Sequence, residues 1–317
     1  MSILINKPGI LTTVQDLGRT GYRRFGINPG GVMDQTATRL INILLGNDDG
    51  AAVLEMHFPA AEIVFEKPCT FAVGGADLSP DLSGIKIDAW CAYAAKAGDT
   101  LRFTSKILGN RAYLAVAGGF VVEKWLGSAS TNLNVGIGGH EGRKLLAGDR
   151  IELLENHDRP RRAMRRISPT LIPHYSVFPT VRITTGAEFD NFDEMGKSVL
   201  ESQNFTISNN SNRMGFRLTG KPLELATPFE FISSAVSFGT VQLLPDGQLI
   251  VLMADHQTSG GYPRLAHVAE RDLPVLAQLG SGDKVAFHLI SHTHAEVLNA
   301  ERERDIALFR VGCMLRR

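Results

Sequence analysis

The residues best suited to chemistry lie in one short loop, residues 255–263 (DHQTSGGYP). Its polar members offer a carboxylate, an amide, a hydroxyl and a phenol: Asp255, Gln257, Thr258 and Tyr262. Gly260 and Gly261 let the backbone turn sharply or approach a ligand closely. An ordinary Gly-Gly bend would also use this sequence, but so many functional side chains exceed what a turn needs. We therefore predict a binding site here.

The flanking segments are predicted to hold this loop in place. Residues 249–253 form a short apolar run, which indicates a buried strand. Asp272 can cap a short helix that has Pro274 in its first turn and Gly280 at its end. Residues 284–287 alternate and predict another strand. Loops positioned by such a scaffold often carry function.

Other glycine-flanked loops add candidate binding residues. Arg19 and Arg213 could hold a carboxylate or phosphate through two hydrogen bonds. Glutamines could hold an amide, and tyrosines could wall a planar ligand. Each side chain alone is more often structural, with Asp34 a helix cap and Arg213 an ion-pair partner. The candidates outside the first loop are Gln15, Asp16, Arg19, Tyr22, Asp34, Ser130, Arg213 and Gln242.

Three other patterns do not support familiar chemistry. Residues 215–221 (GFRLTGK) have phosphate-loop spacing, but Pro222 follows where a Ser or Thr hydroxyl is needed. Residues 136–139 (GIGG) lack dinucleotide-binding spacing and indicate a turn. His288, His292 and His294 would share one face of an extended strand, but a solvated strand end explains them better than a metal. We predict no metal site.

Composition indicates an ordinary globular protein. The chain has 317 residues, 44% hydrophobic and 21% charged, with a formal charge of +0. It can bury a core, and bulk charge recruits neither nucleic acid nor an anionic membrane. Three scattered cysteines indicate neither a disulfide framework nor zinc. Neither a signal peptide nor a membrane span is indicated, so we expect a cytoplasmic location.

Many short alternating runs and abundant glycine predict a mainly β fold with a few short helices. We expect two β-rich modules, residues 1–160 and 174–317, with a basic linker at 159–166 between them. Asp34 should begin a helix that ends at Gly46, and an amphipathic helix should cover residues 295–309. The predicted strands of the first module are 10–14, 52–55, 62–65, 70–73, 85–87, 100–103 and 111–116.

Several blocks, in order, resemble the biotin-dependent carboxyltransferase family that contains the C subunit of 5-oxoprolinase, once called allophanate hydrolase subunit 2, and the KipA proteins. The likeness covers nearly the whole chain, with mild departures at residues 243–245 and at Ser259. The matching blocks are residues 11–22 (LTTVQDLGRTGY), 31–34, 46–47, 54–55, 115–119, 126–128, 212–215, 239–242 and 255–263.

The resemblance implies a cyclophilin-like β-barrel and a role as one subunit of an ATP-dependent 5-oxoprolinase. It implies a KipI-like B subunit that shares the active site, and a LamB/YcsF-like A subunit that completes hydrolysis to L-glutamate. ATP, with Mg²⁺, would be bound by the complex, since this chain has no phosphate loop. It has no biotin attachment segment either. The residues expected to be catalytic are Asp255, Gln257, Tyr262 and Arg213.

Two other functions fit the same resemblance. A carboxyltransferase subunit that acts on urea or another amide would require a biotin-bearing partner. A non-catalytic regulator would bind a KipI-like kinase inhibitor without turnover. An unstrained amide becomes reactive when its oxygen is phosphorylated, which requires positioning and charge stabilisation more than a covalent nucleophile. The polar loops of this chain suit half of such a shared site.

Overall fold

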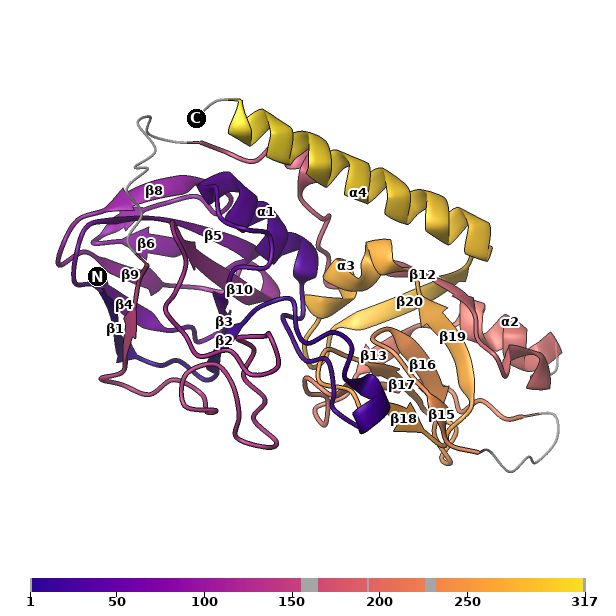
Figure 1. Cartoon of the computed structure of the whole chain (residues 1–317). Coiled ribbons are helices and arrows are strands. Elements are labelled where there is room, and N and C mark those ends of the chain that lie inside the picture. Colours follow the sequence, from indigo (N-terminus) through magenta and orange to yellow (C-terminus); the bar gives the residue numbers. More distant parts are fainter. Residues whose placement is uncertain (1, 155–164, 193, 226–231, 316–317) are drawn as a thin grey trace. The chain divides into compact units, whose positions relative to one another are not determined.

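The computed structural model describes residues 2–154, 165–192, 194–225 and 232–315. Strands far outnumber helices in this part of the chain (Figure 1), so the predicted mainly β fold is confirmed. Two compact units are present: the first comprises Met1–Arg19, Gly30–His174 and Arg304–Arg317, the second Thr20–Pro29 and Tyr175–Glu303. The basic linker lies largely outside the described residues, and the domain limits 1–160 and 174–317 stay a prediction.

The first unit is built from two sheets. One has the strand order β11-β1-β4-β9-β6-β7 and the other β2-β3-β10-β5-β8. Alternating residues of both sheets, such as Ile3 and Ile5 of β1 and Leu54 and Met56 of β3, share one buried core. The strands are β1 (Ser2–Lys7), β2 (Thr12–Gln15), β3 (Val53–His57), β4 (Glu62–Phe65), β5 (Cys69–Asp77), β6 (Pro80–Leu82), β7 (Ile85–Lys86), β8 (Ala92–Ala95), β9 (Thr100–Phe103), β10 (Leu108–Val116) and β11 (Arg150–Glu152).

Helix α1 (Gln35–Leu45) packs on β5 and β10 of the first unit. Its predicted caps are confirmed, because Asp34 Oδ1 accepts a 2.8 Å hydrogen bond from the Ala37 amide and Gly46 is left-handed at φ 78°. The unit also contains the 3₁₀ helix η2 (Pro169–Leu171). The predicted strands correspond to β2–β5, β7, β9 and β10, with ends shifted by a few residues, whereas β1, β6 and β8 were not predicted.

The second unit contains a closed barrel with the strand order β12-β19-β16-β17-β14-β13-β20. The barrel expected from the family resemblance is thus present. Phe205 and Phe287 pack inside it with ring centroids 5.4 Å apart. A two-stranded sheet of β15 and β18 lies beside it. The strands are β12 (Thr180–Thr185), β13 (Phe205–Ile207), β14 (Gly215–Thr219), β15 (Ser234–Ala235), β16 (Thr240–Leu243), β17 (Leu249–Leu252), β18 (Ser259–Gly260), β19 (Arg264–Val268) and β20 (Lys284–Leu289).

The predicted helix after the loop is α3 (Leu273–Ala277), preceded by η4 (Glu270–Asp272). The predicted cap is wrong, because the Asp272 side chain makes no capping hydrogen bond. Its carboxylate instead pairs with the Arg182 guanidinium and accepts the Arg182 amide at 2.7 Å. The helix also ends before Gly280. The remaining helices of the unit are η1 (Arg23–Phe25), η3 (Phe189–Asn191) and α2 (Glu194–Ser202).

The predicted C-terminal helix is α4 (His292–Met314). Ile306 is buried on this helix, whereas Val297 is 50% exposed. His292 and His294 belong to this helix and His288 to β20, so the shared extended strand expected for the three histidines is wrong. Within the described residues, no helix is both long and apolar enough to span a bilayer.

Candidate functional site

In the first unit, the Asp16 carboxylate is committed to the fold. Asp16 follows β2 and is only 6% exposed. Its Oδ1 accepts hydrogen bonds from the Ser128 and Ser130 hydroxyls, both at 2.6 Å, and from the Gly18 amide at 2.8 Å. Its Oδ2 accepts the Ala129 amide at 2.6 Å. Asp16 and Ser130 therefore hold two loops together, and their part in a ligand site stays a prediction.

The neighbours of Asp16 are buried as well. The Arg19 guanidinium donates to the Ser130 carbonyl and lies 4.9 Å from the centre of the Trp125 ring. Gln15 Nε2 donates to the Thr131 carbonyl at 3.2 Å. Gly138, in the GIGG segment, packs so closely that an added Cβ would overlap the Ser130 carbonyl. That segment is a structural turn, as its sequence indicated.

In the second unit, Asp255 and Arg213 neutralise each other. Arg213 Nε and Nη2 donate to the two carboxylate oxygens of Asp255 at 2.8 and 3.1 Å. The Asp255 amide also donates to the Arg213 carbonyl at 2.8 Å. Both side chains are 7% exposed. The pair anchors the start of the 255–263 loop to the segment before β14.

The segment Thr20–Pro29 belongs to this second unit and crosses the same loop. Asn28 Nδ2 donates to the Asp255 carbonyl at 3.3 Å, and the Arg23 guanidinium donates to the Val236 carbonyl. This segment carries Tyr22, which is half-buried. The sequence signal of a glycine-flanked turn therefore found a segment that contacts the predicted site.

His256 is a buried residue that the predicted set omitted. It is 1% exposed, and its Nδ1 lies 2.5 Å from the Gln257 carbonyl. Burial lowers the pKa of this imidazole, and the charge of Arg23 lowers it further. Its place between Asp255 and Gln257, inside the loop predicted as a site, was the available signal.

Gln242 supports the loop from β16. It is fully buried, and its Nε2 donates to the Tyr262 carbonyl at 3.1 Å. Gly260 lies against the same amide, because an added Cβ would be 2.8 Å from Gln242 Nε2. Gln242 thus holds the loop backbone, and the lack of a side chain at Gly260 leaves room for the Gln242 amide.

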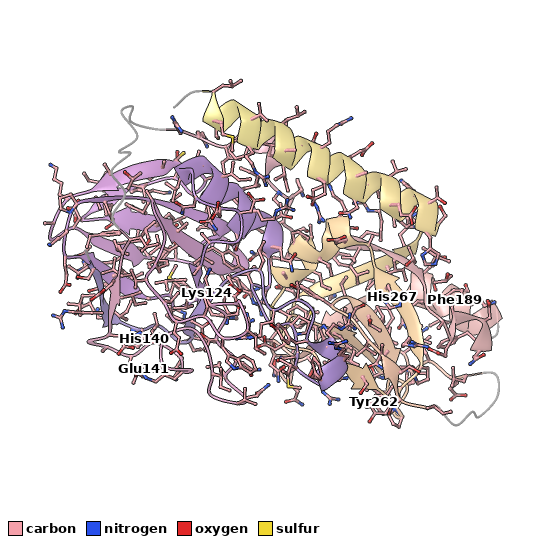
Figure 2. The ribbon with its side chains drawn as sticks, in the orientation of Figure 1. Lys124, His140, Glu141, Phe189, Tyr262 and His267 are labelled. Atoms are coloured by element: carbon pink, nitrogen blue, oxygen red, sulfur yellow. The ribbon has the colours of Figure 1, made fainter. Side chains whose placement is uncertain are left out.

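The side chains that a ligand could reach are fewer than predicted. Gln257 and Thr258 are half-buried, and Tyr262 is 45% exposed at the edge of the unit (Figure 2). Asp34 caps α1 and is fully buried. The accessible members of the predicted set are Tyr22, Gln257, Thr258, Gly260, Gly261 and Tyr262.

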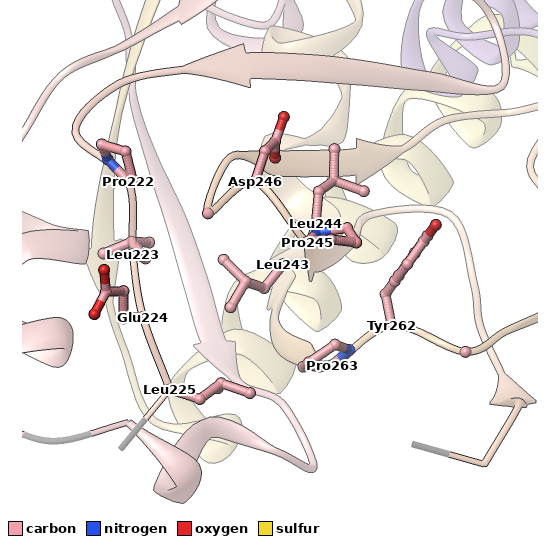
Figure 3. Close-up of a pocket in the computed structure, with 12 residues that line it drawn as sticks. Pro222, Leu223, Glu224, Leu225, Leu243, Leu244, Pro245, Asp246, Tyr262 and Pro263 are labelled. Carbon is pink, nitrogen blue, oxygen red and sulfur yellow. The ribbon is translucent and has the colours of Figure 1, made fainter. Parts of the chain in front are cut away.

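A groove of about 490 Å³ opens beside Tyr262 and Gly261 (Figure 3). Tyr262 and Pro263 stand on one side of it and residues 222–225 on the other. Leucines and prolines form most of the wall, and the carboxylates of Glu224 and Asp246 complete it. The groove has the size of a small-molecule site, but these carboxylates would repel an anionic ligand.

Two further features limit the chemistry. Residues 215–219 form the extended strand β14, which pairs with β17, so the rejected phosphate-loop spacing corresponds to no phosphate cradle. Within the ranges that the structure describes, no group of three His, Cys, Asp or Glu side chains is arranged to hold a metal. The accessible groups can donate and accept hydrogen bonds, and they include no paired nucleophile and base.

Comparisons with known proteins define the class of the chain. The family described as "Carboxyltransferase domain, subdomain A and B" matches residues 25–289, so the chain belongs to this family. The chain is 39% identical to the 5-oxoprolinase C subunit of Haemophilus influenzae, covering 92% of each protein. It is 37% identical to the 5-oxoprolinase C subunit of Escherichia coli, covering 95% of this chain and 94% of that protein.

A solved structure confirms the fold assignment. The structure of the K. lactis urea amidolyase is similar with a TM-score of 0.90 and 29% identity over 97% of this chain. The chain spans only 20% of that much longer protein. The fold of this chain is therefore found within a much longer protein.

Proposed function

We propose that this chain is the C subunit of an ATP-dependent 5-oxoprolinase, which converts 5-oxoproline, ATP and water to L-glutamate, ADP and phosphate. The observation that carries the proposal is the similarity to two 5-oxoprolinase C subunits over 92–95% of this chain and 92–94% of theirs. The chain would act with a KipI-like B subunit and a LamB/YcsF-like A subunit in one complex.

The accessible loop residues suit the positioning that this reaction needs. Gln257, Thr258 and Tyr262 can donate hydrogen bonds to the lactam oxygen or to the substrate carboxylate. The Arg213–Asp255 pair and Gln242 fix the backbone that carries them. Arg213 and Asp255 would thus be positioning residues, since both are buried and paired.

Nucleotide binding is assigned to the complex rather than to this chain alone. ATP binding normally uses a backbone cradle for the phosphates, and the one segment with such spacing is a strand. We therefore place the nucleotide, with Mg²⁺, at a site to which the KipI-like B subunit would contribute.

The test is glutamate release from 5-oxoproline and ATP by the purified chain mixed with its two partner subunits. Tyr262→Phe, which keeps the ring and removes the hydroxyl, should lower kcat/KM about tenfold or more. Tyr93→Phe is the matched control, because the Tyr93 hydroxyl accepts the Asp88 amide at 2.9 Å in the other unit. A mixture that binds but releases no glutamate would contradict the proposal.

The likeness to urea amidolyase favours a second candidate, a carboxyltransferase subunit. That function requires carboxyl transfer from a biotin-bearing partner to urea or another amide. Carboxylation that depends on added carboxybiotin, with no 5-oxoproline turnover, would favour it. Tight binding to the KipI-like protein with neither activity would instead indicate a regulator.

A further inference from the structure

An exposed turn of the second unit presents two arginines and a phenylalanine, Arg23–Phe25 (η1). Phe25 is 63% exposed. The Arg24 guanidinium carbon lies 4.7 Å from the centre of the Phe25 ring, so the two side chains form one stacked pair at the surface. Large apolar side chains on a surface often mark interaction sites when they cluster with other contact residues.

The turn is held in a defined conformation. The Phe25 amide donates to the Tyr22 carbonyl at 2.9 Å and the Gly26 amide to the Arg23 carbonyl at 3.0 Å. Gly26 ends the turn at φ 77°. The Arg23 side chain ties the turn to Val236. Because the backbone is already ordered, docking a partner here would cost little conformational entropy.

The positive charge of the turn is not balanced locally. Among the residues that the structure describes, neither Arg23 nor Arg24 makes an ion pair, although the chain as a whole has a formal charge of +0. A surface that leaves guanidinium groups unpaired is complementary to carboxylates on another molecule.

The segment that carries the turn is linked by hydrogen bonds to the candidate loop and to the segment before β14. Asn28, at the end of the segment that carries the turn, binds the carbonyl of Asp255, and Asp255 pairs with Arg213. Met214 follows Arg213 and is 40% exposed, and Tyr262 ends the candidate loop at 45% exposure. Arginine, methionine and aromatic residues are the types enriched in protein interfaces, whereas carboxylates are depleted there.

We propose that Arg23–Phe25, together with Met214 and Tyr262, forms a docking surface for a protein partner with acidic side chains around an apolar recess. This inference rests on the proposed function in one respect: it takes the KipI-like B subunit as that partner. A partner docked here would lie beside Gln257 and Tyr262 and would complete the half-site that this chain provides. Side chains as exposed as Phe25 suit a protein surface better than a small ligand, which pockets largely enclose.

The experiment measures the dissociation constant of the full-length chain and the purified KipI-like protein by calorimetry at 50 and 300 mM salt. The double variant Arg24→Glu with Phe25→Ala should weaken binding about tenfold or more. The wild-type affinity should fall with salt, and the variant should lose this dependence. The matched control is Arg217→Glu, which reverses an exposed arginine on β14. It should bind the KipI-like protein as the wild type does.

The outcomes separate this surface from the function. Equal affinity of the wild type and the double variant, or no binding of the wild type, would overturn the surface. An unchanged affinity with a raised KM for 5-oxoproline would assign Arg24 to substrate binding instead and would also overturn it. If the double variant binds more weakly and the wild-type complex releases no glutamate, the docking surface is supported and the proposed function is contradicted. If the double variant melts at a lower temperature than the wild type, Arg24→Glu alone gives the decisive measurement.

Discussion

The sequence names candidate site residues, but only their partners in the structure show which of them stabilise the fold and which a ligand can reach. Asp16 and Asp255 were equally good candidates by residue type. The structure commits Asp16 to donors in the 128–130 segment and Asp255 to Arg213. Sequence spacing could not reveal these partners, because Ser128 is 112 positions from Asp16. It did reveal Gln257 and Tyr262, which remain accessible in the 255–263 loop.

The Arg213–Asp255 pair leads to a prediction about stability. Asp255→Asn removes the carboxylate charge that the buried Arg213 guanidinium faces, and we expect unfolding to become easier by about 3 kcal/mol. Glu188→Gln, which breaks the more exposed pair with Arg264, should cost about 1 kcal/mol or less. Urea denaturation of both variants measures the difference. If Asp255→Asn kept wild-type stability and lost only turnover, Asp255 would act on the substrate and not on the fold.

At the scale of elements, alternation and caps predicted most of the strands of the first unit and both ends of α1. The sequence-based prediction was wrong where a side chain binds a residue distant in the sequence instead of the neighbouring backbone. Asp34 and Asp272 both precede a helix, but Asp34 caps α1 whereas Asp272 pairs with Arg182 on β12. β1 was missed because its residues, SILINK, form too short an apolar run at the end of the chain. Its pairing with β4 and β11 supplies the stability that local sequence lacks.

The glycine turn at residues 136–139 allows two effects of an added methyl group to be separated. Gly136 and Gly138 both have left-handed backbones, at φ 68° and 77°. An added Cβ at Gly136 meets nothing within 4 Å, whereas at Gly138 it overlaps the Ser130 carbonyl and lies 2.8 Å from Arg19 Nη2. Gly136→Ala should therefore cost about 1 kcal/mol, the backbone strain alone.

Gly138→Ala should cost clearly more than Gly136→Ala, because the loop that holds Ser130 must move as well. Thermal melting of the two variants, each compared with the wild type, gives the measurement. Equal melting temperatures for the two variants would contradict the close packing of Gly138 on Ser130. A lower melting temperature for Gly138→Ala than for Gly136→Ala would show that residues 136–139 support the hydrogen bonds between Asp16 and Ser130.

At the scale of the whole molecule, the formal charge of +0 conceals groups whose protonation is linked to folding. His256 and His267 are both largely removed from water, and this burial is the main cause that lowers the pKa of each below the ordinary 6.5. In the unfolded chain each histidine would bind a proton near its ordinary pKa, whereas in the folded chain it binds a proton only at lower pH. The contribution of these histidines to the free energy of unfolding should therefore be fully present above about pH 6.5 and should fall as the pH drops below it.

Melting temperatures between about pH 7.5 and 5.5 test this linkage. The window lies above the range where the carboxylates of Asp149 and Glu188 titrate, since partners hold the pKa of each below its ordinary value. Each histidine can contribute a slope of at most about 1.4 kcal/mol per pH unit. His256→Gln should flatten the decline, whereas His174→Gln, at an exposed position, should leave it unchanged. A wild type equally stable at both pH values would show that His256 accepts its proton in the folded chain, and the loop around Asp255 would then have to open to water.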